Sequence, residues 1–143
     1  MIAYVDASVL LRVALGQPNS LAEWEAVERG VASALVLTES LRTWDRLRLR
    51  VSLADTEVAA RRAMILSIVA SLEIADVDAG VLQRAAEPMP TELGTLDAIH
   101  LATALLWRDA TGEDLTIATH DLALATAAEA YGFAVVGASS RRG

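Results

Sequence analysis

Four acidic residues stand where apolar segments of the chain end or begin: Asp6, Glu39, Asp97 and Asp121. Asp6 interrupts one apolar stretch and Asp97 lies within another, where a carboxylate is costly unless it is paired or bound to a metal ion. Carboxylate oxygens suit a hard cation such as Mg²⁺, which keeps several of its waters and therefore needs few protein ligands. The four acids therefore predict a Mg²⁺ site.

Each acid also has a simpler explanation. Acidic residues are common in the first turn of a helix, because they interact favourably with the helix dipole by about 0.3–1 kcal/mol. This explanation suits Glu39 or Asp121 taken alone. It suits Asp6 and Asp97 less well, because their neighbours in the sequence are apolar.

The segments that must position these acids alternate along the chain between predicted strands and predicted helices. Short apolar runs predict strands at 2–5, 32–36, 73–77, 115–118 and 133–136. Capping residues and apolar periodicity predict helices at 8–15, 20–30, 37–51, 55–72, 79–87, 96–107 and 121–131. This alternation, without a hairpin signal, predicts an α/β fold with a parallel sheet between two layers of helices. The four acids fall at the carboxyl edge of that sheet, where α/β proteins form their sites.

Composition narrows the class of protein further. The chain has 143 residues, 54% of them hydrophobic, which predicts one α/β domain with buried strands. No apolar run reaches the roughly 18 residues of a membrane helix, no basic apolar leader is present, and cysteine is absent, so we expect a cytoplasmic location and no membrane association. The absence of lysine excludes P-loop and Schiff-base chemistry. A net charge of −7 argues against non-specific binding of nucleic acid over the whole surface.

Four motifs resemble those of a known family. They are the segment Tyr-Val-Asp-Ala-Ser-Val-Leu-Leu at 4–11, Thr38-Glu39 followed by Arg42, Leu-Asp-Ala-Ile-His-Leu-Ala-Thr-Ala at 96–104, and Thr-His-Asp at 119–121. In order and spacing, and over nearly the whole chain, they are similar to the motifs of the PIN-domain family, most closely the VapC-type toxins of bacterial toxin–antitoxin pairs.

The resemblance implies a PIN-like three-layer α/β/α sandwich whose five-stranded parallel sheet has the order 3-2-1-4-5. It implies a single PIN domain at residues 1–137, after which the polar residues 138–143 are expected to form a frayed tail. The implied activity is that of an endoribonuclease dependent on Mg²⁺, or on Mn²⁺ as a substitute, in which a metal-activated water cuts RNA. The catalytic residues and metal ligands would be Asp6, Glu39, Asp97 and Asp121. The implied partners are a small antitoxin and a second copy of the chain in a homodimer.

Two alternatives remain beside this interpretation. One is a catalytically silent binding module on a PIN-like scaffold, which the presence of all four acids disfavours. The other is a phosphoryl-transfer fold such as a haloacid-dehalogenase phosphatase or a receiver domain. Those folds need a second acid near Asp6, where this chain has Ser8, and a lysine that it lacks.

Four further polar residues lie beside the acids. Ser8 and Thr119 either cap helices and turns or orient the acids and the water around a metal ion, and the sequence favours neither reading. His100 shares a helix face with Asp97, and we interpret it as a supporting residue rather than a metal ligand. His120 is expected to face solvent in a loop.

Three arginines on the predicted helix 37–51 are candidate RNA contacts: Arg42, Arg46 and Arg50. Arg46 and Arg50 share a stripe with Glu39, and Arg42 lies beside it, so a basic ridge would start at the acids. Arginine grips phosphate with two hydrogen bonds, which suits this task.

The ridge also has a plain alternative. It could be a solvated helix face joined by local pairs such as Glu39–Arg42 and Asp45–Arg48, each worth a few tenths of a kcal/mol.

Overall fold

The structure is a computed structural model, and it describes residues 1–138. Its centre is a five-stranded parallel sheet in the order β3-β2-β1-β4-β5, which confirms the predicted sheet. The strands are β1 (Ile2–Val5), β2 (Arg29–Ser33), β3 (Glu73–Ala75), β4 (Thr116–Ala118) and β5 (Ala134–Val136). β1 occupies the middle position, where Ala3 lies opposite Gly30 on one side and Thr116 on the other.

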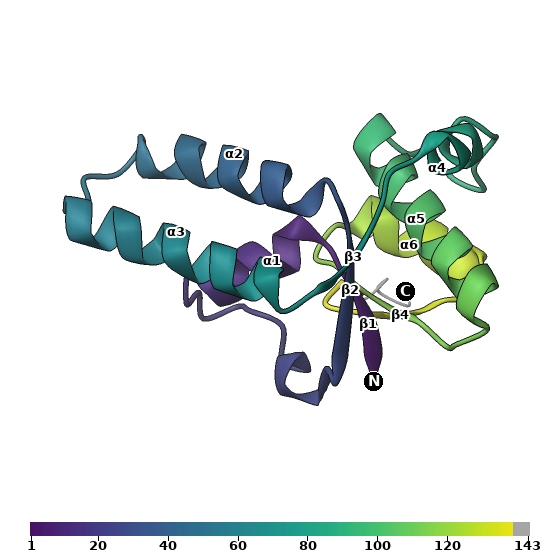
Figure 1. The fold of residues 1–143 in the computed structure, drawn as a ribbon, viewed down its shortest axis with the longest axis horizontal. Helices are drawn as coiled ribbons and strands as arrows, with labels where there is room; N and C mark the ends of the chain where they lie inside the picture. The colour runs from purple at the N-terminus through teal and green to yellow at the C-terminus, as the bar shows by residue number, and fades with distance from the viewer. Residues whose placement is uncertain (139–143) are drawn as a thin grey trace.

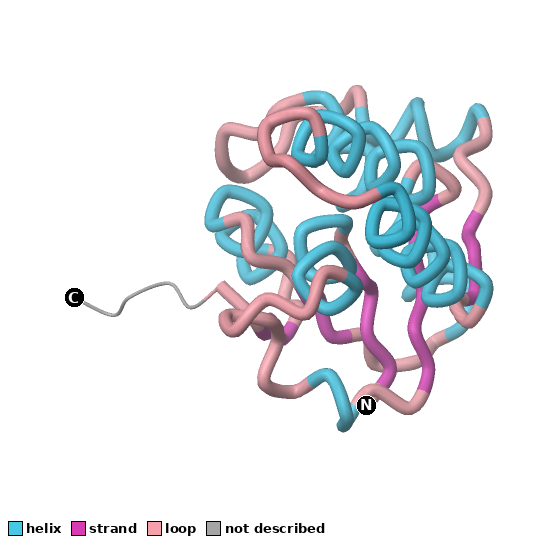
Figure 2. Tube along the Cα trace, turned by 90° about the vertical axis from the view of Figure 1, so that its left-hand side faces the viewer, coloured by secondary structure: helices cyan, strands magenta, loops and turns pink. Residues whose placement is uncertain are grey.

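Two layers of helices cover the sheet (Figure 1). The helices are α1 (Ala7–Ala14), α2 (Val36–Arg48), α3 (Asp55–Ala70), α4 (Ala79–Ala85), α5 (Thr95–Thr111) and α6 (Leu122–Ala130). The first three pack on one another on one face of the sheet, and in Figure 2 they lie in front of the strands. The last three pack on the other face. Within residues 1–138, no helix has the length and apolar character needed to cross a membrane.

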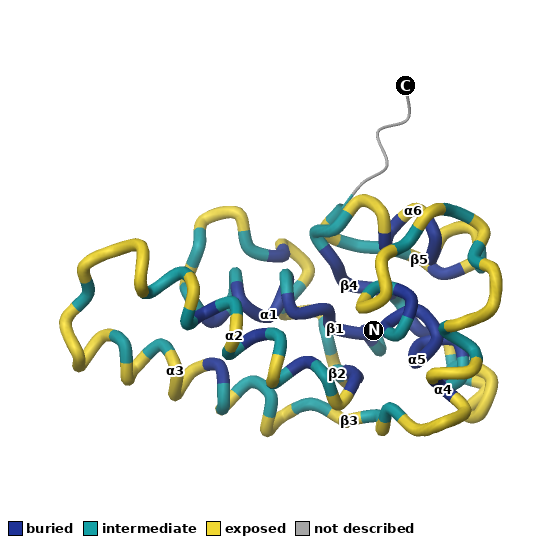
Figure 3. The backbone as a smooth tube through the Cα atoms, turned by 90° about the horizontal axis from the view of Figure 1, so that it is seen from above, coloured by how far each residue is buried: buried dark blue, intermediate teal, exposed yellow. Residues whose placement is uncertain are grey.

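Each face of the sheet has its own apolar core. Successive residues of a strand point to opposite faces, so Ala3 and Val5 pack with α1, α2 and α3, whereas Tyr4 packs with α5 and α6. The middle strand and the inner turns of the neighbouring helices are accordingly buried (Figure 3). Burial on both faces explains why the strands of this sequence read as continuous apolar runs.

Helices α2 and α3 form a long hairpin that extends past the sheet (Figures 1 and 3). Its tip carries two exposed apolar side chains, Leu49 at 75% and Val51 at 58% exposure. The predicted helix 37–51 is too long at its end, because α2 ends at Arg48 and the chain turns before Val51.

The predicted helix at 20–30 was also wrong. That segment contains only a 3₁₀ turn, η1 (Trp24–Ala26), and β2 begins at Arg29, three residues before the predicted strand at 32–36. Gly30 lies in this strand, where a Cβ atom would be 2.4 Å from Leu72 Cδ2, so a larger residue there would require the Leu72 side chain to shift. Of the predicted tail, residues 139–143 lie outside the described residues.

Candidate active site

Asp6 follows β1 directly and is 6% exposed. Its Oδ2 atom accepts hydrogen bonds from two hydroxyls, Ser8 Oγ at 2.9 Å and Thr119 Oγ1 at 2.7 Å. Ser8 also accepts from the backbone amide of His120, and Thr119 from the amide of Asp121. Of the two roles open for these hydroxyls, Ser8 orients the acid, whereas Thr119 both orients the acid and closes a turn.

Glu39 lies in the first turn of α2, and its Oε1 atom is 2.5 Å from Nε2 of His100. The other ring nitrogen of His100, Nδ1, is 2.6 Å from the hydroxyl of Tyr4. His100 lies in a buried part of α5, and its side chain is 1% exposed. His100 was predicted to be a supporting residue, whereas Tyr4 was not predicted: its only signal in the sequence is a polar hydroxyl within an apolar strand.

Burial and nearby charges shift two pKa values in this cluster in ways that matter for its chemistry. Burial raises the pKa of the Tyr4 hydroxyl well above its ordinary value, and the charges of Asp6 and Glu39 raise it further. Burial alone lowers the pKa of His100, but the hydrogen bond to Glu39 and the charges of Glu39, Asp6 and Asp97 outweigh it, so the pKa is raised. Tyr4 therefore stays a neutral hydroxyl, and a positive charge on His100 is favoured.

Asp97 lies in the first turn of α5 and is partly buried. Burial raises its pKa to about 6, and the negative charges of Asp121 and Asp6 add to the effect, while His100 opposes it. The structure thus brings these three aspartates close enough to repel one another. Such repulsion is relieved by a proton or by a cation.

Asp121 is the N-cap of α6, and its Oδ1 atom accepts hydrogen bonds from the backbone amides of Ala123 and Leu124. Asp121 therefore stabilises the start of α6, as the simpler explanation for this acid predicts. It does not exclude a second role, because the cap uses one oxygen of the carboxylate.

Three of the acids share one feature: a hydrogen bond holds one of the two carboxylate oxygens. The held oxygens are Oδ2 of Asp6, Oε1 of Glu39 and Oδ1 of Asp121. The Asp121 carboxylate also interacts with the side chain of Asp97. The held oxygen fixes the direction of each carboxylate.

The site is not a ready-made metal centre. Among residues 1–138, no three acidic or histidine side chains converge closely enough to form one. The donor set nevertheless fits Mg²⁺, because this ion is commonly bound through one or two carboxylates and completes its shell with water and substrate oxygens. The raised pKa of Asp97 fits as well, since burial and the charges of Asp121 and Asp6 disfavour its ionised form and a nearby cation would favour it.

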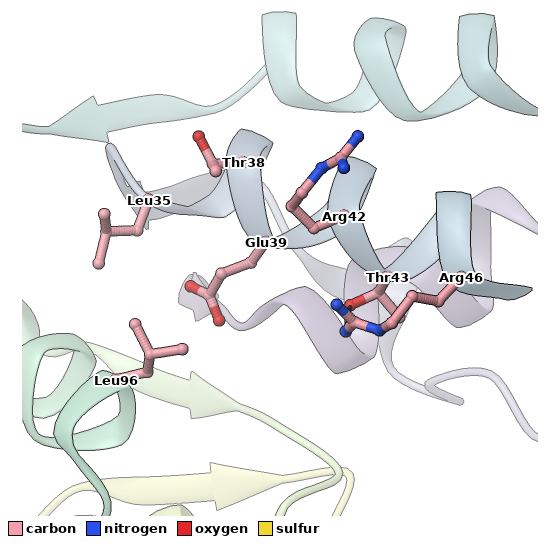
Figure 4. Close-up of a pocket in the computed structure, with 7 residues that line it drawn as sticks. All are labelled: Leu35, Thr38, Glu39, Arg42, Thr43, Arg46 and Leu96. Carbon is pink, nitrogen blue, oxygen red and sulfur yellow. Dashed lines mark hydrogen bonds between the residues drawn. The ribbon is translucent and has the colours of Figure 1, made fainter.

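A pocket of about 340 Å³ opens beside Glu39 (Figure 4). It is lined by Leu35, Thr38, Glu39, Arg42, Thr43, Arg46 and Leu96. Arg46 donates to Thr43 Oγ1 at 3.2 Å. Two of the three predicted RNA-contacting arginines, Arg42 and Arg46, therefore line a pocket that contains a predicted catalytic acid, whereas Arg50 is exposed beyond the end of α2.

The expected Glu39–Arg42 pair does not form. Arg42 pairs with Asp45 instead, and it points away from the Glu39 carboxylate in Figure 4. The expected Asp45–Arg48 pair is present at 3.1 Å. The Glu39 carboxylate instead binds His100, which belongs to the helix layer on the other face of the sheet.

His120 differs from the expectation of a solvent-facing loop residue. It is only partly exposed, Nδ1 lies 3.2 Å from the carbonyl oxygen of Gly137, and Nε2 is buried. The side chain packs against the chain after β5 because its backbone amide is fixed by Ser8.

Comparison with known proteins agrees with this fold. The model of the PIN domain matches residues 3–130. The chain is 35% identical to Ribonuclease VapC46 of Mycobacterium tuberculosis (strain ATCC 25618 / H37Rv) over 144 residues, which cover 95% of this chain and 97% of the relative. The chain therefore belongs to the PIN-domain family and, within it, to the VapC-type proteins.

Solved structures show the same fold at low sequence identity. The structure of FitAB bound to an IR36 DNA fragment has a TM-score of 0.65 at 23% identity, covering 94% of this chain and 93% of that one. PAE2754 from Pyrobaculum aerophilum has a TM-score of 0.64 at 20% identity, covering 94% and 83%. A toxin–antitoxin complex from Klebsiella pneumoniae has a TM-score of 0.59 at 18% identity, covering 84% and 85%.

Proposed function

We propose that the chain is a Mg²⁺-dependent endoribonuclease and the toxin component of a toxin–antitoxin pair. The observation that carries the proposal is the shared geometry of Asp6, Glu39 and Asp121, each with one carboxylate oxygen held by a hydrogen bond, beside an Asp97 whose pKa is raised to about 6. The relative from M. tuberculosis, which is named a ribonuclease and matches nearly end to end, supports it.

The acids would hold the cation, with Asp6 and Asp97 contributing most. Bound Mg²⁺ would polarise the scissile phosphate and make water a better nucleophile at neutral pH. Ser8 and Thr119 keep Asp6 oriented, and the N-cap bonds do the same for Asp121. A cation would keep Asp97 ionised, since opposite charge lowers the pKa that burial and repulsion have raised.

The substrate strand would approach along α2. Arg42 and Arg46 line the pocket beside Glu39, and Arg50 is exposed further along the chain. Their guanidinium groups would bind backbone phosphates, which would let a chain with a net charge of −7 hold RNA locally.

The proposal is tested by incubating single-stranded RNA with the purified protein. We expect cleavage with Mg²⁺ or Mn²⁺, none in EDTA, and products that carry 5′-phosphate and 3′-hydroxyl ends. Products with 2′,3′-cyclic phosphate, or undiminished cleavage in EDTA, would contradict it. RNA binding without cleavage under every metal would favour the catalytically silent binding module.

The partner we propose is a small antitoxin that covers the acids, and the toxin itself would act as a homodimer. Two structural neighbours are titled as a toxin–antitoxin complex and as FitAB bound to DNA. An arginine or lysine of the antitoxin would neutralise the acidic site.

Expression of the chain alone should arrest growth, and Asp6→Asn or Asp97→Asn should abolish the arrest. Arrest that persists in both variants would contradict a nuclease toxin.

A further inference from the structure

A buried hydrogen-bonded line runs from the sheet to the candidate active site. It starts at the Tyr4 hydroxyl on β1, passes through the imidazole of His100 on α5, and ends at Oε1 of Glu39 on α2. The two bonds measure 2.6 and 2.5 Å, and both Tyr4 and His100 are 1% exposed. The line connects the two helix layers, since α5 and α2 cover opposite faces of the sheet.

The chemistry of the three groups fixes the hydrogen bond at Glu39. An ionised carboxylate can only accept hydrogen bonds, so Nε2 of His100 must carry the hydrogen that binds Glu39. The Tyr4 hydroxyl can both donate and accept: it donates to Nδ1 of a neutral ring and accepts from Nδ1 of the positively charged ring. In either form the hydrogen bond to Tyr4 orients the imidazole, so that Nε2 faces Glu39 as a donor.

Glu39 has more need of such support than the aspartates of the site. Its side chain has more rotatable bonds, and ordering a glutamate side chain costs more conformational entropy. It also has Arg42 three residues away on the same helix, a spacing that favours a competing ion pair. In the structure Arg42 binds Asp45, and Glu39 binds His100.

We propose that Tyr4 and His100 are positioning residues for RNA cleavage: they hold Oε1 of Glu39 so that Oε2 faces the cation and the substrate. This role rests on the proposed nuclease function. It assigns to the His100 of the Leu-Asp-Ala-Ile-His segment a task separate from that of Asp97, and it gives the buried Tyr4 hydroxyl a reason to be there.

Four variants test the proposal through RNA cleavage. Tyr4→Phe removes the hydroxyl and keeps the ring, and His100→Leu removes both hydrogen bonds. His100→Gln retains an amide that can donate to Glu39. We expect Tyr4→Phe and His100→Leu to lower kcat by about 10- to 100-fold with little change in KM for RNA, and His100→Gln to recover part of the loss. The matched control Tyr131→Phe removes the hydroxyl that contacts Met89 and should cut RNA like the wild type.

A second readout does not depend on activity. In the metal-free protein, the ¹⁵N signal of His100 Nε2 should move in Glu39→Gln and the Nδ1 signal should move in Tyr4→Phe. Neither should move in Thr103→Val, which removes a buried hydroxyl from the same helix that is bonded only to Ile99.

The outcomes separate this proposal from the proposed function. If the wild type cuts RNA and both Tyr4→Phe and His100→Leu have wild-type kcat, the positioning role is wrong. Equal losses in His100→Gln and His100→Leu, or ring signals that stay in place, would also overturn it. If the wild type cuts no RNA while the ring signals move as expected, the hydrogen-bonded line is real and it is the nuclease function that fails.

Discussion

The Thr119 hydroxyl lies 2.7 Å from Oδ2 of Asp6 and joins the end of β4 to the end of β1. It is fully buried, and its oxygen also accepts from the amide of Asp121. One side chain therefore sets both the direction of a carboxylate and the turn that leads to a second one.

Replacing Thr119 with valine should damage stability and activity together. The change keeps the shape but leaves Oδ2 of Asp6 and the Asp121 amide each short of a partner, which costs about 1–3 kcal/mol for a buried polar group. Urea unfolding and RNA cleavage should both show the loss, and Thr119→Ser should recover much of it. Thr126→Val is the control, because the Thr126 hydroxyl binds only a carbonyl of its own helix. A Thr119→Val protein as stable and active as wild type would contradict this account.

Neutralising the central acids should abolish cleavage and leave the fold intact. Asp6→Asn and Asp97→Asn remove negative charge from a cluster that repels itself, so Asp97→Asn in particular should be at least as stable as wild type without metal. Cleavage of labelled RNA and thermal unfolding measure the two effects. Asp114→Asn, at the other edge of the sheet, is the matched control and should remain active. Glu39→Gln and Asp121→Asn should give intermediate losses.

The metal-free protein should lose stability as the pH rises through the titration of Asp97. The folded state raises the pKa of this carboxyl to about 6, so between the ordinary aspartate value and 6 the folded protein holds a proton that the unfolded chain has released. The contribution of Asp97 to the free energy of unfolding must then fall with rising pH across that range. Urea unfolding at a series of pH values measures the slope.

Two comparisons isolate the contribution of Asp97. Asp97→Asn should remove the Asp97 contribution to the fall of the unfolding free energy below pH 6. His100 also has a raised pKa, so it lowers the unfolding free energy as the pH rises, but at higher pH. That second decline should remain in Asp97→Asn. Mg²⁺ should raise stability at neutral pH in the wild type and not in Asp97→Asn. A pH dependence of stability that is the same in Asp97→Asn as in the wild type would contradict the pKa shift.

The arginines of α2 should contribute to RNA binding through charge. Arg46→Ala and Arg50→Ala should each weaken binding and flatten its dependence on salt by roughly 0.7 in the log–log slope for a single strand. Arg42→Ala should have a smaller effect, because Arg42 is already paired with Asp45. Arg29→Gln, at the opposite edge of the sheet, is the control. Wild-type binding by Arg46→Ala and Arg50→Ala across a salt series would show that α2 is only a solvated face.

The sequence predicted the parallel sheet and placed the acids at its carboxyl edge, because parallel strands buried on both faces leave a strong apolar signal. The order of the strands followed from the resemblance to the PIN-domain family. It did not predict that β2 starts at Arg29, since Glu28, Arg29 and Gly30 are poor strand formers. Tertiary contacts decide that segment: Gly30 lies against Leu72, and Arg29 forms ion pairs with Glu73 and Glu113.

The hydrogen-bond partner of Glu39 could not be predicted from the sequence for a related reason. A local pattern offers Arg42, three residues away, but the structure pairs Glu39 with His100, 61 residues further along the chain. Contacts between the two helix layers depend on how both pack on the sheet, and sequence periodicity describes each helix by itself. For the same reason the role of Tyr4 was not predicted: its hydroxyl contacts His100 only in the folded protein, and its strand is otherwise apolar.

The pairing of β1 with β4 has a consequence for synthesis of the protein. Ala3 lies opposite Thr116, so the middle of the sheet closes only after more than a hundred intervening residues have been made. Asp6 emerges from the ribosome early, yet Thr119, which orients it, emerges near the end. A translating ribosome therefore carries a chain whose acids are still unassembled, and any activity at this site begins only once β4 has joined the sheet.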